Sequence, residues 1–492
     1  MNHKFQVNLS GIIDLLSNHL YSSPEVFLRE LLQNGVDAIR ARENFEPNYS
    51  GNLSIEIVNS ITQDEATLIF VDNGIGLTED EIHRFLSTIG ESSKREESIH
   101  SSNDFLGRFG IGLLSCFVVS DEIVLLTRSI KPEAKTIEWR GYSDGTYSIR
   151  YLEQELTPGT RIYLRAKKGF ERYFQQETIF KLAAHFGGIL PYPITIASNN
   201  KTEVVNKEAP PWKQEFSSLS LDERRQVIHD FGLKNLEVSA FDCIDLKSSL
   251  GGVEGIAFIL PYAPSSAAKA THRVYLKNML LSEKVTDLLP DWAFFVKCII
   301  NVRDLRPTAS RESFYEDANL AAVRGILGEC IKSYLLELAQ SQPNRFQQLI
   351  SLHCLAIKAL AVHDDEFYRL LINLLPFETS MGKMTIADYR QRSSVVRYVE
   401  NVDRFRQISG VADSQSICII NGGYVYDLEL LEKLPHIFPD IAVEKVDSSA
   451  LIQEFDDLTF PEREQAFNFI KAADLVLQSF KCSAEIRKFL PL

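Results

Sequence analysis

The chain has 492 residues, a formal net charge of −14, 7 cysteines and 10 histidines. This length allows two or three domains with sizeable cores. The acidic charge disfavours a general duplex-binding surface, so we do not expect nucleic acid as a partner. The cysteines form no CxxC pair and the histidines no HExxH motif, which disfavours a disulfide framework or a zinc site. Apolar runs are too short to span a membrane, and the N-terminus lacks a signal pattern. We therefore expect a cytoplasmic protein without membrane contact.

A predicted helix around residue 30 carries the first polar group in the chain. Glu30 and Asn34 are four residues apart and Asp37 follows at i+7, so the three share one helix face. Taken alone, such a stripe is more often a solvated surface. The alternative interpretation is that Glu30 is a catalytic base and that Asn34, one turn later, is a metal ligand.

An apolar run at residues 66–71 (ATLIFV) predicts a buried strand that ends at Asp72. A carboxylate at that position can accept a hydrogen bond from an exocyclic amine. Gly74 and Gly76 would let the backbone approach a flat ring without interference from a Cβ atom. The simpler interpretation is an ordinary Asp-Asn-Gly hairpin turn. Strands are also predicted at residues 53–58, 123–126 and 160–164.

Residues 78–81 have the spacing of a capping box and predict a short helix through Phe85. The following segment is polar and flanked by glycines, which is typical of a lid that folds over a ligand and opens again. We expect this lid at about residues 84–112.

Gly107, Gly110 and Gly112 precede an apolar stretch at residues 113–119 that predicts a buried helix. Glycines that open a helix expose backbone N–H groups to an anion, and the helix dipole favours that anion. The spacing matches neither the dinucleotide-binding fingerprint nor a Walker P-loop. A further short element, Gly159-Thr160, follows downstream.

These four elements together resemble the ninety-kilodalton heat-shock chaperone family, bacterial type, within the Bergerat-fold ATPase superfamily. The closest segments are residues 21–34 (YSSPEVFLRELLQN) and 105–112 (FLGRFGIG). The resemblance implies an α+β fold, with a Bergerat-fold sandwich of one mixed sheet covered by helices on one face. An α/β middle domain and a small α/β unit would follow.

The resemblance implies ATPase activity with ATP and Mg²⁺ as cofactors. Glu30 would orient and deprotonate the attacking water, and Asn34 would ligate Mg²⁺. Asp72 would read the adenine amine, with Thr160 assisting through water. The family normally places a lysine near Glu91, so the resemblance implies that this contact is either lost or moved to Lys94. The other implied nucleotide contacts are Asp37, Gly74, Gly76, Leu77, Gly107, Phe109, Gly110, Ile111 and Gly112.

The middle region carries one chemical motif, at residues 304–312 (DLRPTASRE). In the family the equivalent loop brings an arginine to the γ-phosphate, and Arg311 occupies that position. Without the resemblance, Arg311 would read as an exposed arginine in a polar loop. Thr308 and Tyr315 depart from the family pattern, which has Asn and Gln at these positions.

We expect an ATP-binding domain at residues 1–200, a linker at 201–211, a middle domain at 212–345, a helical connection with a small α/β unit at 346–460, and a short helical tail at 461–492. Within the middle region, strands are predicted at 253–260 and 273–276 and a helix at 291–300. Helices are predicted at 320–338 and 347–362. In the small unit, strands are predicted at 416–420 and 441–446 with a helix at 427–434 between them.

The family's C-terminal dimerisation domain is expected to be missing, because only some thirty residues remain after the small unit. Dimerisation would then be ATP-driven, through the first domains and the segment 1–9. The function that the resemblance implies is an ATP-dependent chaperone that opens and closes on protein clients. The alternative is a partner-specific ATP-driven module of the same superfamily, serving a signalling, defence or DNA-transaction complex.

Overall fold

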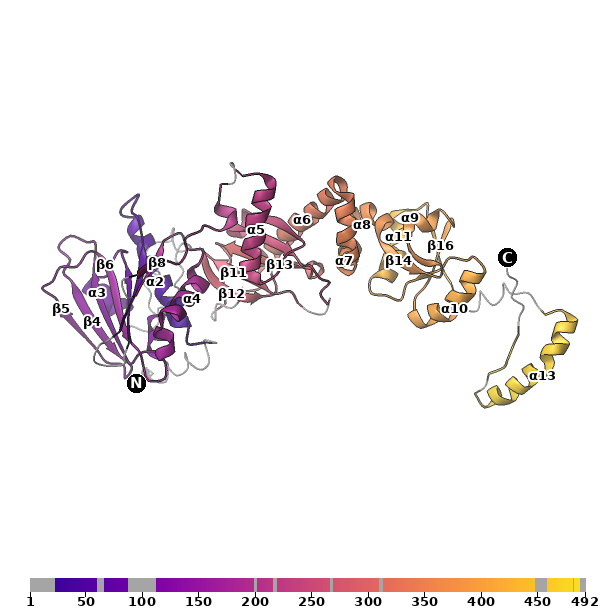
Figure 1. The fold of residues 1–492 in the computed structure, drawn as a ribbon, viewed down its shortest axis with the longest axis horizontal. Coiled ribbons are helices and arrows are strands. Elements are labelled where there is room, and N and C mark those ends of the chain that lie inside the picture. The colour runs from indigo at the N-terminus through magenta and orange to yellow at the C-terminus, as the bar shows by residue number, and fades with distance from the viewer. Residues whose placement is uncertain are drawn as a thin grey trace, which may run out of the picture. The chain divides into compact units, whose positions relative to one another are not determined.

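The computed structural model describes residues 23–59, 66–86, 112–198, 201–215, 219–265, 269–308, 313–446, 458–480 and 482–486. The chain divides into two compact units. The first comprises Met1–Leu260, Ala270–Leu289 and Val296–Cys330, and the second comprises Pro261–Lys269, Pro290–Phe295 and Ile331–Leu492. Three sheets organise these units (Figure 1).

The first sheet has eight strands in the order β5-β4-β3-β6-β2-β1-β7-β8. All neighbours are antiparallel except β1 and β7, so the sheet is mixed, as predicted. The strands are β1 (Leu53–Asn59), β2 (Ala66–Asp72), β3 (Glu122–Arg128), β4 (Ile137–Tyr142), β5 (Tyr147–Tyr151), β6 (Gly159–Arg165), β7 (Ile194–Ser198) and β8 (Lys201–Val204). Strand β8 occupies the start of the stretch that the sequence suggested as a linker.

One face of the first sheet, here called the inner face, is covered by helices α2 (Val26–Glu43) and α4 (Gln176–Gly187). Short 3-10 helices η3 (Gly112–Val118) and η4 (Glu171–Phe174) complete this layer. Phe27 of α2 stacks on Phe174 of η4, with ring centroids 6.2 Å apart. Helix α3 (Glu79–Phe85) begins at the predicted capping box, because Thr78 and Glu81 exchange hydrogen bonds. The helix predicted at 113–119 is the 3-10 helix η3.

The second sheet has five strands in the order β12-β11-β13-β10-β9. Only β11 and β13 pair in parallel. The strands are β9 (Asp242–Ser248), β10 (Val253–Ile259), β11 (His272–Leu276), β12 (Met279–Val285) and β13 (Val296–Val302). The helix predicted at 291–300 is wrong: the 3-10 helix η7 (Asp291–Ala293) leads into β13. A short, mostly apolar segment does not distinguish a buried helix from a central strand, and here the pairing of β13 with β10 and β11 decides.

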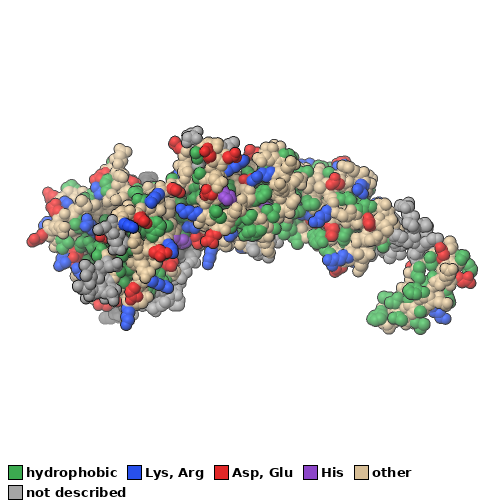
Figure 2. All heavy atoms as spheres, in the orientation of Figure 1, with side chains coloured by type: hydrophobic (Ala, Val, Ile, Leu, Met, Phe, Trp, Pro, Cys, Tyr) green, Lys and Arg blue, Asp and Glu red, His purple; other side chains and the backbone are tan. Residues whose placement is uncertain are grey.

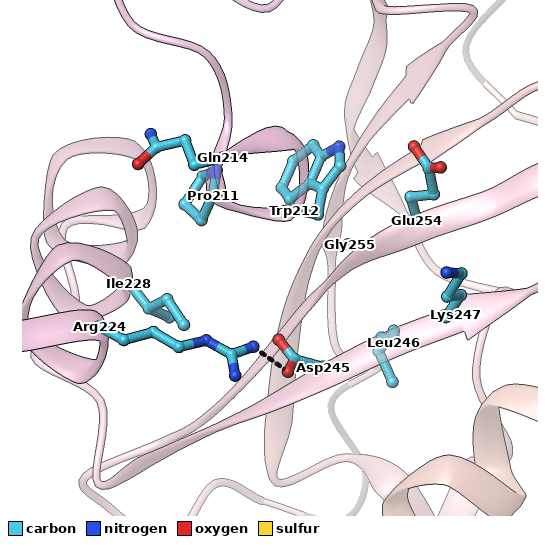
Figure 3. A pocket seen from close by; sticks show the side chains of 10 residues that line it. All are labelled: Pro211, Trp212, Gln214, Arg224, Ile228, Asp245, Leu246, Lys247, Glu254 and Gly255. Carbon is cyan, nitrogen blue, oxygen red and sulfur yellow. Dashed lines mark hydrogen bonds and ion pairs between the residues drawn. The ribbon is translucent and has the colours of Figure 1, made fainter. Parts of the chain in front are cut away.

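A cavity of about 220 Å³ lies beside this second sheet (Figure 3). It is bounded by the 3-10 helix η5 (Pro211–Lys213), helix α5 (Leu221–Leu236) and strands β9 and β10. Trp212 packs edge-on against Phe231 with ring centroids 5.6 Å apart, and Arg224 pairs with Asp245 across the cavity. None of the predicted site residues lines this cavity.

The long helix α6 (Ala318–Ser341) and the helices α7 (Pro343–His363) and α8 (Asp365–Leu371) follow, with the 3-10 helix η8 (Ile372–Leu374). A third sheet, in the order β15-β14-β17-β16-β18, then forms the small α/β unit. Its strands are β14 (Pro376–Thr379), β15 (Gly382–Thr385), β16 (Val395–Val399), β17 (Ile420–Asn421) and β18 (Ala442–Lys445), and its helices are α9 (Ile386–Arg390), α10 (Val402–Ser414) and α11 (Asp427–Ile437). The predicted helices at 320–338, 347–362 and 427–434 are confirmed.

The last described helix is α13 (Phe460–Leu477), followed by the 3-10 helix η9 (Gln478–Phe480). None of its described residues is buried, and Phe460, Phe467 and Phe469 are 81%, 61% and 68% exposed. Hydrophobic side chains are visible along this helix in Figure 2. No helix among the described residues is both long and apolar enough to cross a membrane.

Candidate functional site

Helix α2 carries the first group of predicted site residues. Glu30 and Asp37 are buried, with exposed fractions of 2% and 3%, and Asn34 between them is half-buried. Arg29 Nη2 donates a hydrogen bond to Glu30 Oε1 at 3.3 Å, so a buried cation contacts this carboxylate. Acidic side chains are almost never this buried unless they are paired or functional. This face of the helix is therefore not a solvent-exposed polar surface.

Asp72 ends strand β2 on the inner face and is 5% exposed. Burial raises the pKa of Asp72 to about 7, although backbone N–H groups of Gly74 and Thr160 donate to the carboxyl group and oppose that rise. The Gly74 bond is 2.9 Å long. Asp72 and Thr160 are directly opposite each other in the pairing of β2 with β6, so the second and fourth sequence elements meet here.

The turn after Asp72 lies tightly against its surroundings. A Cβ atom on Gly74 would lie 2.5 Å from the Cβ of Ala38, which is one turn after Asn34 on α2. Gly76 has a φ of +66°, and a Cβ there would clash with the carbonyl oxygen of Arg128. The Ile75 N–H donates to the Ala38 carbonyl at 3.0 Å. The glycines are thus required by close backbone approach.

The third sequence element meets the first at Gly112. A Cβ atom on Gly112 would lie 2.5 Å from Glu30 Oε2, so the first residue of η3 abuts the carboxylate predicted to act as the base. Cys116 of η3 is fully buried nearby, where burial and the charge of Glu30 raise the pKa of its thiol. This thiol is therefore a packed neutral group at physiological pH.

Two polar residues that the sequence did not single out hold the site together. Thr127 of β3 is fully buried, and its hydroxyl accepts from the Leu77 N–H at 2.9 Å and donates to the Gly159 carbonyl at 3.0 Å. Its oxygen also lies 3.3 Å from that of Thr160. Arg42 donates to the Asn73 carbonyl at 3.0 Å. Arg42 is eight residues after Asn34 and thus shares its helix face, which is the one signal that could have identified it.

Six of the predicted site residues lie outside the described residues: Lys94, Gly107, Phe109, Gly110, Ile111 and Arg311. The base of the Arg311 loop is described. The Thr308 N–H donates to the Ser313 carbonyl at 2.9 Å, and the Tyr315 N–H donates to the Arg306 carbonyl at 3.0 Å. The Arg306 guanidinium lies over the Tyr315 ring at 4.6 Å. Thr308 and Tyr315, the two departures from the family pattern, therefore both brace this loop.

This arrangement fits an adenine nucleotide. The buried Asp72 carboxylate can accept a hydrogen bond from an exocyclic amine, whereas Gly74 and Gly76 are needed for close approach to Ala38 and Arg128 of the chain itself. Among the described residues no group of three or more His, Cys, Asp or Glu side chains gathers around a metal position.

Comparison with known proteins agrees with this geometry. Residues 21–157 match the family model described as "Histidine kinase-, DNA gyrase B-, and HSP90-like ATPase", and residues 198–406 match "Hsp90 protein". The chain is similar to the chaperone protein HtpG of Chlorobium chlorochromatii, with 26% identity over 410 residues that cover 79% of this chain and 64% of the relative. For HtpG of Desulfitobacterium hafniense the identity is 26%, covering 77% and 63%.

The HtpG protein of Buchnera aphidicola is 30% identical over 428 residues, which cover 82% of this chain and 67% of the relative. The chain spans slightly less than two thirds of the length of the first two relatives, at 64% and 63%. Together, the two adjoining family models and these relatives show that the chain belongs to the Hsp90 family.

Proposed function

We propose that this chain is an ATP-hydrolysing chaperone that binds ATP on the inner face of its first sheet and couples turnover to the handling of protein clients. The observation that carries the proposal is the pair of buried carboxylates: Asp72, which is bonded to Gly74 and lies opposite Thr160, and Glu30, which Gly112 abuts. The names of its relatives support the chaperone assignment. A cytoplasmic location and a role in protein folding under stress belong to the same proposal.

In this proposal Asp72 accepts a hydrogen bond from the adenine amine, and Thr160 assists through water. Thr127 and Arg42 keep the surrounding backbone in place through the contacts described above. Nucleotide contacts by Asp37, Leu77 and Lys94 and by the glycine-rich segment 107–112 are part of the same proposal. Bound Mg²⁺, held by Asn34, would neutralise phosphate charge.

For the chemical step, Glu30 orients a water molecule and accepts its proton as the oxygen attacks the γ-phosphorus. The bond from phosphorus to the bridging oxygen breaks, and ADP leaves. Arg29 holds the Glu30 carboxylate in place at 3.3 Å. Arg311 stabilises negative charge on the transferring phosphoryl group.

The test is whether the purified chain suppresses the aggregation of several unrelated unfolded proteins, and whether ATP changes that suppression. A chaperone suppresses all of them, and a Glu30→Ala variant alters the ATP response. A partner-specific module suppresses none. Turnover-dependent protection of unrelated proteins supports the proposal, and its complete absence overturns the chaperone part. ATP-driven association of two copies is a further part of the proposal, measured by light scattering with and without ATP.

A further inference from the structure

The cavity beside the second sheet, here called the α5 cavity, is lined by none of the residues assigned to the nucleotide. It has a volume of about 220 Å³ and lies between η5, helix α5 and strands β9 and β10 (Figure 3). Pockets for drug-sized ligands usually measure roughly 300–1,000 Å³, so this cavity suits a smaller molecule of about ten non-hydrogen atoms.

Part of the wall of the α5 cavity is apolar. Pro211 and Trp212 come from η5, and Ile228 comes from α5. Pro211 and Ile228 are buried, and the Trp212 indole is half-buried. Small-molecule sites are typically lined by apolar and aromatic side chains with a few polar groups among them. An apolar ring or short hydrocarbon chain would therefore find contacts on both η5 and α5.

The two carboxylates at the α5 cavity already have cationic partners. Asp245 is paired with Arg224, as the dashed line in Figure 3 marks. Glu254 forms ion pairs with Lys213 at 2.7 Å and with Arg303 at 3.0 Å, one at each carboxylate oxygen. Neither carboxylate is therefore left over to bind a cationic ligand.

Two hydrogen-bond donors at the cavity have no partner. Lys247 is directly opposite Glu254 in the pairing of β9 with β10. The cations already on Glu254 take its place, and the Lys247 ammonium group forms no ion pair or hydrogen bond within the part of the chain that the structure describes. The Trp212 indole N–H is buried and makes no hydrogen bond to the described residues either.

These two donors define the chemistry of the missing partner. A buried N–H group without an acceptor costs free energy, and an unpaired ammonium group favours an acceptor that carries negative charge. A carboxylate accepts a charge-assisted hydrogen bond from an ammonium group and has a second oxygen for a further donor. A phosphate ester fits less well, because its higher charge would be repelled by Asp245 and Glu254 at the same cavity.

We propose that the α5 cavity binds a small carboxylic acid with an aromatic or short apolar body. The carboxylate of this ligand would meet Lys247, and its body would pack against Pro211, Trp212 and Ile228. Because Trp212 belongs to η5 and Lys247 to β9, such a ligand would also hold η5 against the second sheet.

The experiment titrates benzoate, phenylacetate and 3-phenylpropanoate into the full, nucleotide-free chain at neutral pH and follows binding by calorimetry. These acids have the same charge and ring and differ in chain length. We expect at least one of them to bind with a Kd of about 1 mM or below. The corresponding amides, which lack the charge, and acetate, which lacks the apolar body, should bind at least about tenfold more weakly. Phenethylamine, which carries the opposite charge, should not bind.

Variants of Lys247 place the binding in the α5 cavity. Lys247→Gln should weaken binding of the tightest acid by about tenfold or more, whereas Lys247→Arg should keep most of it. The matched control is Lys234→Gln, which removes an exposed lysine of α5 that does not line the cavity and should leave the affinity unchanged. Lys247 is also exposed, so we expect its variants to fold, and circular dichroism checks this.

Several results would overturn the proposal. Absence of binding by all three aromatic acids would do so, as would equal affinity for an acid and its amide, because the ammonium group would then have no role. Acetate binding as tightly as the aromatic acids would show that the cavity contributes nothing. Binding of phenethylamine, or wild-type affinity in Lys247→Gln, would also contradict it.

Discussion

The first and second sheets bury their strands in different ways. In the first sheet β2 and β3 alternate between buried and half-buried residues, so one face is buried and the other is partly exposed to solvent. In the second sheet six of the seven residues of β10 and of β13 are buried, so these strands are enclosed on both faces. The buried face of the first sheet includes the polar residues Asp72, Thr127 and Thr160, whereas the buried side chains of β10 and β13 are almost entirely apolar.

This difference suits the two sheets to different roles: the first carries the polar groups proposed to bind and hydrolyse ATP, and the second supports the Arg311 loop. Buried polar groups are costly unless they are bonded, and the first sheet accepts that cost at Asp72. The second sheet ends β13 just before the Arg311 loop, whose base is fixed by backbone bonds from Thr308 and Tyr315. If this comparison is correct, changes on the inner face of the first sheet should alter ATP binding or turnover, and changes in the second region should alter turnover alone.

The largest effect is expected for Glu30→Ala. The variant should keep nearly normal ATP affinity, because the carboxylate touches the water and not the nucleotide. Turnover should fall on the order of a hundredfold or more. The matched control is Glu43→Ala, which removes a carboxylate at the far end of the same helix, where it binds the Tyr192 hydroxyl at 2.8 Å. Steady-state phosphate release measures both, and wild-type turnover in Glu30→Ala would place the base elsewhere.

The next effect is expected for Arg311→Ala in the full chain. Arginine fingers contribute roughly 10³–10⁵ in the best cases, and the altered loop base leads us to expect only about tenfold to a hundredfold here. ATP affinity should change little, because the charge acts on the transition state. Arg303→Ala, which removes an exposed partner of Glu254, is the control. Single-turnover hydrolysis at the wild-type rate in Arg311→Ala would mean that all groups needed for hydrolysis lie in the domain of the first sheet.

Asp72→Asn should stabilise the nucleotide-free chain at alkaline pH. The pKa of Asp72 is raised from 3.8 to about 7. Between these pH values the carboxyl group is therefore protonated in the folded chain and ionised in the unfolded chain. The free energy of unfolding therefore falls as pH rises from about 4 to about 7, and the destabilisation is complete above pH 7. The amide lacks this charge, so we expect a gain of roughly 1–3 kcal/mol at pH 8 that shrinks towards pH 4. Urea unfolding measures it, and a less stable variant at pH 8 would contradict it.

A smaller effect is expected on the pH dependence of ATP affinity. Below pH 7 Asp72 becomes protonated, and the carboxyl group loses the charge that favours the adenine amine. Affinity of the wild-type chain should then fall with decreasing pH, by at most about tenfold per pH unit. Asp72→Asn should lack this component. Phosphate groups titrate equally in both experiments, so the ratio of the two affinities isolates Asp72, and a ratio independent of pH would rule out its titration.

Much of the first sheet could be predicted from the sequence. Alternating and bounded apolar runs identified β1, β2, β3 and β6, and the capping box identified the start of α3. Glu30, Asn34 and Asp72 fell at the expected positions on helix and strand, because helical spacing and strand ends are local properties. The second sheet was harder, since six of the seven residues of β13 are buried and the strand carries no strict alternation that would identify it.

The supporting network of the site could not be predicted. Thr127 and Arg42 act through hydrogen bonds to backbone groups that are distant in sequence, and only the folded pairing of β3 with β6 and the docking of α2 bring them together.

The most direct test of the central claim is calorimetric titration of ATP into wild-type and Asp72→Asn chains at pH 8. Asp72 supplies the charge-assisted hydrogen bond that reads the base, and losing it should cost about 1.5–3 kcal/mol, or tenfold or more in affinity. The account predicts that loss in a variant that is folded and no less stable than the wild type. Unchanged ATP affinity in Asp72→Asn would contradict the assignment of the nucleotide site to the inner face of the first sheet.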